Sequence, residues 1–168
     1  LDLDAGEEDR DPIAARLSAR AIADPHGNQG ETGRPFRSPA DTFDSRVSAL
    51  LYEAFASFHA TRGGLERVRV GRQYVTGAET FHMDGVSVST GLPPGRGGPR
   101  WTAFGGVPVH LYEKSPSGDW LAGVGADGSP WEGGRASLEL VHVQDRLSLL
   151  GAEGVGRDDL VTASLWQS

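Results

Sequence analysis

The chain has 168 residues, of which 38% are hydrophobic and 24 are glycine, and its formal net charge at pH 7 is −7. This length predicts one domain with a core, and the glycine content predicts short elements joined by many turns. The lack of cysteine excludes disulfides and thiolate metal sites. The acidic balance argues against a nucleic-acid partner, and the lack of an apolar run of about 18 residues predicts no membrane span.

Residues 1–38 predict a polar N-terminal arm, punctuated by glycine and proline. A short helix over 12–23 is expected inside it, with Ile13 and Leu17 one helical turn apart. A helix of about twelve residues is unstable alone, so this apolar stripe is expected to bind either the main domain or a partner. The chain begins at Leu1 rather than Met, which indicates a processed chain, organellar or exported, or a fragment.

Residues 39–168 predict the main domain, which opens with a helix over 39–62. Ser38 can cap this helix, Pro39 suits its first position, and Gly63-Gly64 ends it. Apolar residues recur at helical spacing, at Phe43, Val47, Leu50, Leu51, Ala54, Phe55 and Phe58. This face predicts a helix packed on a sheet.

After Gly64 the apolar residues alternate, as in strands. Asp84-Gly85 is typical of a tight turn and predicts a hairpin over 79–90. Further strands are expected over 65–76, 100–104, 107–113, 135–143, 146–150 and 161–165. Together these elements predict an α+β fold, in which one long amphipathic helix packs on a largely antiparallel sheet that could curl into a partial barrel.

Three histidines each lie between apolar residues on an expected strand: His82, His110 and His142. Because side chains alternate, His82 is expected to point away from Phe81 and Met83. Imidazoles from neighbouring strands could bind zinc or iron. The alternative is that the three histidines make ordinary hydrogen bonds on a solvent-facing or second layer.

Arg67 and Arg69 alternate with valines and should share one face of a strand. Their guanidinium groups could bind a phosphate, a carboxylate or the acidic arm of a neighbouring subunit. The alternative is a solvated face on which they pair with the chain's own acidic residues.

The four tryptophans lie in the β-rich half, at Trp101, Trp120, Trp131 and Trp166. Their rings could stack on sugars or on a partner surface. The alternative is that they fill the core of a small sheet domain.

No nucleophile elbow and no His-Glu-x-x-His motif occurs in the sequence. We therefore expect a soluble, non-catalytic accessory or structural subunit of a larger assembly, without a cofactor. It would bind other protein subunits through its arm and its Gly/Pro-rich loops. The alternatives are a small β-barrel-like metalloenzyme or ligand-binding domain that uses the histidines, and a carbohydrate or peptide binding module that uses the tryptophans.

Overall fold

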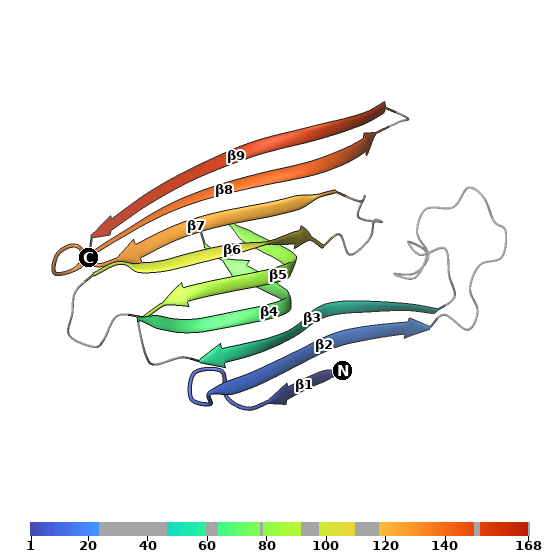
Figure 1. Ribbon diagram of the computed structural model, residues 1–168, viewed down its shortest axis with the longest axis horizontal. Helices are drawn as coiled ribbons and strands as arrows, with labels where there is room; N and C mark the ends of the chain where they lie inside the picture. Colours follow the sequence, from blue (N-terminus) through green and yellow to red (C-terminus); the bar gives the residue numbers. More distant parts are fainter. Residues whose placement is uncertain are drawn as a thin grey trace.

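The structure, a computed structural model, describes residues 1–23, 47–59, 64–77, 79–91, 98–109, 118–149 and 152–167. In these residues the chain forms one sheet of nine strands, in which each strand pairs antiparallel with the next (Figure 1). The strands are β1 (Asp2–Ala5), β2 (Ile13–Ala23), β3 (Val47–His59), β4 (Leu65–Thr76), β5 (Thr80–Thr90), β6 (Arg100–Pro108), β7 (Trp120–Gly128), β8 (Gly134–Leu149) and β9 (Ala152–Gln167). β1 and β9 form the opposite edges of the sheet.

The antiparallel sheet is confirmed, but the predicted α+β class is wrong. The described residues contain no helix, and so none that could cross a membrane. The part of the expected 39–62 helix that is described is strand β3. In β3, Phe55 points to one face and Phe58 to the other, and both are apolar. A strand with two apolar faces lacks the alternation by which strands are recognised, so its sequence resembled a helix.

The N-terminal prediction of an extended arm with a short helix is also wrong. Residues 2–5 and 13–23 are strands β1 and β2, and β2 pairs along its whole length with β3. Backbone pairing within the sheet therefore orders residues 2–5 and 13–23. The expected domain boundary at residues 38 and 39 lies outside the described residues.

Several predicted breaks in the chain do not occur. Residues 80–90 form one continuous strand, because Asp84 and Gly85 pair with Arg72 and Gly71 of β4 instead of forming a turn. Likewise, the two strands expected over 135–150 are the single strand β8. Two strands were also expected over 100–113. Of these residues, 100–109 are described, and they contain the single strand β6, which ends at Pro108.

The sheet has an inner and an outer face, and the buried core lies on the inner one. Residues that pair directly across strands place their side chains on the same face. The core is a cluster on the inner face of β4 to β8, made of Val75, Met83, Phe104, Leu121 and Val141. Met83 is fully buried.

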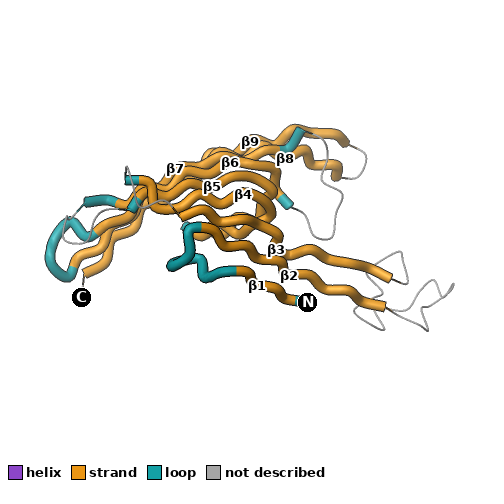
Figure 2. The backbone as a smooth tube through the Cα atoms, turned by 60° about the horizontal axis from the view of Figure 1, so that its bottom comes forward, coloured by secondary structure: helices purple, strands orange, loops and turns teal. Residues whose placement is uncertain are grey.

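A row of glycines allows the sheet to bend around this core. Gly71, Gly85 and Gly106 are direct neighbours across β4, β5 and β6 on the inner face. A Cβ atom at any of the three would lie less than 3.0 Å from a backbone atom of the adjacent strand. The adjoining ends of β4 and β5 curl behind β6 and β7 (Figure 1), and Gly77, in the turn between β4 and β5, lies against the Glu139 side chain of β8. Figure 2 shows this curvature from a second direction.

Candidate functional site: an apolar outer face and a charged inner face

A continuous row of apolar residues crosses the outer face of the sheet. Each of the eight strands from β2 to β9 contributes one residue to it, and each of these residues pairs directly with the next. These residues, here called the outer row, are Ile13, Phe58, Val68, Val88, Ala103, Val124, Leu140 and Val161. No side chain in the outer row can form a hydrogen bond.

The outer row is the centre of a wider apolar surface. Val70 and Val86 lie on one side of it, and Trp101, Ala126, Leu138 and Ala163 on the other. We call the outer row together with these six residues the apolar band. Many of its side chains are open to solvent: Val161 is 70% exposed, Ile13 62% and Leu138 49%. Large apolar side chains thus cover the open face of this sheet, whereas a sheet with one face in water normally carries polar residues there.

Polar and aromatic residues border the band where it ends at β4 and β5. The guanidinium of Arg72 donates two hydrogen bonds to the carboxylate of Asp84, at 2.7 and 2.6 Å. These hydrogen bonds hold the pKa of Asp84 below its ordinary value, against the opposing effect of partial burial. Beside this pair, His82 stacks on Tyr74 with ring centroids 4.2 Å apart.

A similar border lies across β7, β8 and β9. Nδ1 of His142 is 2.6 Å from Oδ1 of Asp159, and the His142 ring packs on Trp120 with centroids 4.6 Å apart. Trp120 begins β7, whereas Trp101 is the second residue of β6. Because β6 and β7 are antiparallel, these two exposed tryptophans lie at opposite ends of the band.

On the inner face, the row of residues that lies one position from the outer row on each of the strands β3 to β9 has the opposite chemistry. The inner row that neighbours the outer row consists of His59, Arg67, Ser89, Thr102, Gly125, Glu139 and Thr162. No member of this inner row has an apolar side chain. A shift of one residue toward this row therefore changes the surface from apolar to polar, whereas the inner row on the other side of the outer row contains the core residues Phe104 and Val141.

Arginines on the inner face form a cluster of ion pairs. Glu8, from the loop between β1 and β2, binds Arg69 and lies 3.7 Å from Arg67, which also pairs with Asp9. Arg69 also stacks over the Phe55 ring, 5.2 Å from its centroid.

The ion pairs continue along the lining of an inner cavity of about 280 Å³. Its lining includes Arg67, Arg69, Arg100 and Arg135. Arg100 binds Glu66, and Arg135 lies 3.8 Å from Asp127. Since each of these four arginines has a carboxylate partner, the cavity is polar but electrically balanced. Its charges therefore give little attraction for a further anion.

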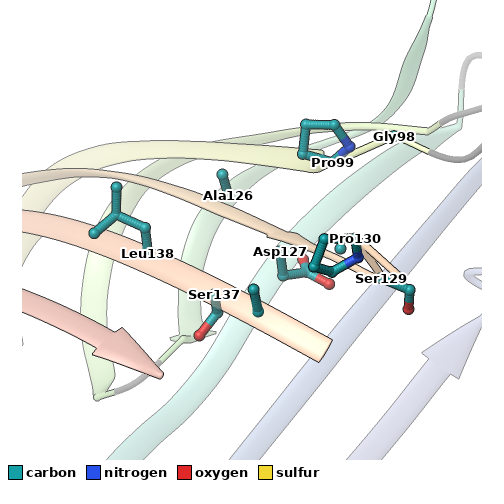
Figure 3. A pocket seen from close by; sticks show the side chains of 10 residues that line it. Gly98, Pro99, Ala126, Asp127, Ser129, Pro130, Ser137 and Leu138 are labelled. Carbon is teal, nitrogen blue, oxygen red and sulfur yellow. The ribbon is translucent and has the colours of Figure 1, made fainter. Parts of the chain in front are cut away.

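A shallow groove of about 520 Å³ lies at the Trp101 end of the band (Figure 3). Pro99, Ala126, Pro130 and Leu138 line it, together with the polar residues Asp127, Ser129 and Ser137. The groove extends the apolar surface beyond the strand ends and contains one ionisable side chain, Asp127.

The structure separates the two described histidines of the predicted metal site. His82 lies on β5 and His142 on β8, so two strands stand between them. Nε2 of His82 is 2.6 Å from the carbonyl oxygen of Tyr52, to which it can donate. Among the described residues, no group of three or more His, Asp or Glu lies together as a metal ion would require. His110 lies outside the described residues, so the three-histidine site stays a prediction. As predicted, His82 points away from Met83, which is buried on the other face.

The structure divides the four predicted partner-binding residues between the two faces. Ile13 belongs to the outer row, and Leu17 lies on the same face between Leu3 and Ala54. Arg67 and Arg69 share the inner face, as expected, and their carboxylate partners Glu8 and Asp9 come from the same chain. Sequence reasoning missed the apolar band, although the alternation of Val68, Val70, Val86 and Val88 was a visible signal of it.

The remaining tryptophans do not fill the core. Trp166 lies on the inner face beside Arg135, Trp131 lies in the turn before β8, and each is at least 42% exposed. Family models, curated proteins and solved structures offer no match to this chain.

Proposed function

We propose that this protein has a structural, non-catalytic role and acts through its apolar band, which is covered by an apolar partner in the working protein. The observation that carries the proposal is the outer row, in which eight consecutive strands each contribute an apolar side chain to the open face.

The size of the band supports an interface. At about 4.8 Å per strand, eight strands extend roughly 38 Å across the sheet. Along β6, the apolar surface from Trp101 to Val107 covers six residue steps, or about 20 Å at 3.3 Å per residue. The band is narrower on the other strands: its fourteen residues, at about 4.8 by 6.6 Å each, cover on the order of 450 Å². That is the size of the largest apolar patch of a typical monomer, roughly 300–600 Å², which is often functional.

The inner face supports a structural role more than a catalytic one. Its arginines are held by carboxylates of the same chain, which fixes their positions and balances their charge. The partner is either a set of other protein subunits, as the sequence suggested, or lipid. In both cases the band is the contact surface.

Sedimentation velocity of the full chain without detergent tests this proposal. We expect the wild-type chain to self-associate, and a variant with Val124→Ser, Leu140→Ser and Val161→Ser to sediment as a smaller species. A control variant carries Ser89→Ala and Thr162→Ala in the inner row and should associate like the wild type. A wild-type chain that is monomeric without any amphiphile would contradict the proposal.

A further inference from the structure

The partner that covers the band must fit a surface with three properties. The outer row is apolar from β2 to β9 and offers no hydrogen-bonding side chain. The band is bordered by exposed tryptophans at its two ends. Charged and polar pairs, Arg72 with Asp84 and His142 with Asp159, lie at its margin.

The first property distinguishes lipid from protein. Protein interfaces contain about one hydrogen bond per 100–200 Å², so a protein partner over a surface of this size would normally find several polar groups to bind. Acyl chains need none, because they contribute only apolar contacts. An unbroken apolar row therefore fits a fluid hydrocarbon partner better than a folded protein surface.

The second and third properties match the layering of a bilayer. Tryptophan is enriched where hydrocarbon meets the headgroup layer, because its ring is apolar and its N–H is polar. Strands that face lipid alternate apolar outward and polar inward residues, with an apolar band about 25 Å tall between aromatic rims. Along β6 alone, the outer face is apolar from Trp101 to Val107, about 20 Å from the residue rise, which is close to that height. The charged inner face supplies the polar side of the same alternation.

We propose that the apolar band lies against the acyl chains of a lipid bilayer. This inference rests on the proposed function, since it names the partner that covers the same surface. Trp101 and Trp120 then lie near the headgroup layer, the outer row lies against hydrocarbon, and the ion pairs of Arg67, Arg69 and Arg100 lie on the side away from lipid.

The lack of native cysteine allows a clean test by single-cysteine labelling. The full chain would carry Val161→Cys or the matched neighbour Thr162→Cys, each labelled with bimane and reconstituted in phosphatidylcholine vesicles. Vesicles with bromine atoms on the acyl chains, compared with unbrominated ones, report contact between the label and hydrocarbon. Ala103→Cys and Thr102→Cys repeat the comparison on β6, four strands from the β2 end of the row.

We expect bromine to quench the labels at 103 and 161 several-fold more than those at 102 and 162. A second outcome is that the emission of the outer labels reports a water-free environment but bromine does not quench it. If unlabelled copies of the Val161→Cys chain also form disulfides with one another, then protein covers the band. That result would overturn the lipid assignment and leave the proposed function standing. If the outer labels emit as water-exposed in vesicles, or the chain does not associate with vesicles, the lipid assignment falls. Water-exposed outer labels in every condition would end both proposals.

Discussion

The outer row and the inner row lie one residue apart on the same strands, and they differ in almost every physical property. The outer row is apolar and open to its surroundings, whereas the inner row is polar and shielded by the curl of the sheet. A protein surrounded by water normally shows the reverse distribution. The difference teaches that the two faces are built for different surroundings, and that the arginines of the inner face are held there by ion pairs with carboxylates of the same chain.

The largest contrast is expected for leucines of the two faces. Leu121 is 2% exposed in the inner core, whereas Leu138 is 49% exposed in the band. Leu121→Ala leaves a cavity and should lower the free energy of unfolding by about 3 kcal/mol. Leu138→Ala, on an open surface, should change it by about 0.5 kcal/mol. Urea unfolding of both variants in the same detergent measures the difference, and equal losses would contradict the assignment of the faces.

Neighbouring glycines give a second contrast. A Cβ at Gly106 would lie less than 3.0 Å from backbone atoms of β5, whereas the nearest atom to a Cβ at Gly105 is 3.6 Å away. Gly106→Ala should therefore cost about 2 kcal/mol through backbone displacement. Gly105→Ala should be close to neutral. Thermal unfolding distinguishes the two, and a neutral Gly106→Ala would show that the glycine row does not set the bend.

A smaller effect is expected from the inner ion pairs. Glu8 and Arg69 are both largely shielded, with side chains 28% and 25% exposed. Arg69→Gln should lower the free energy of unfolding by about 1.5 kcal/mol, because it removes a charged hydrogen bond. A double-mutant cycle with Glu8→Gln isolates the pair. A coupling free energy near zero would mean that the loop between β1 and β2 is not anchored by this contact.

The smallest effect is expected at the border of the band. The folded-state pKa of Asp84 is lowered by Arg72, so their interaction stabilises the fold above the unfolded-state pKa near 3.9 and is lost as the pH falls through the folded-state value. At neutral pH, Asp84→Asn should cost about 0.5 kcal/mol, since the pair is exposed and screened. The cost should shrink below about pH 4 as the wild-type carboxylate protonates. A cost that does not vary with pH would contradict this cause.

The sequence allowed a correct prediction of strand directions and of the side-chain orientation at His82. It did not reveal which face was buried, because alternation shows that two faces differ without showing which one lies inside. The alternation of Arg67 and Arg69 with valines therefore placed the arginines together on one face without showing which face that was. In the structure, Val68 and Val88 face outward, while Arg67 and Ser89 face inward.

The spacing of apolar residues caused the error over β3. Phe55 is buried on the inner face and Phe58 belongs to the outer row, so aromatic residues lie on both faces of this strand and their three-residue spacing resembles that of a helix. The expectation of no membrane span rested on the lack of a continuous apolar run, and the described residues contain no helix that could span a membrane. The apolar band contains no such run, because its residues occupy every second position of the strands. The bend at Gly85 was equally hidden, since a glycine required by close backbone contact has the same letter as one required by a turn.

The most direct test is a nitroxide scan along β9 from Leu160 to Leu165, with the full chain in phosphatidylcholine vesicles. Collisions with oxygen report a hydrocarbon environment, and collisions with a water-soluble nickel complex report a polar one. Our account predicts oxygen maxima at 161, 163 and 165, with lower values at 160, 162 and 164. Nickel maxima at 161, 163 and 165, or no alternation at all, would contradict it.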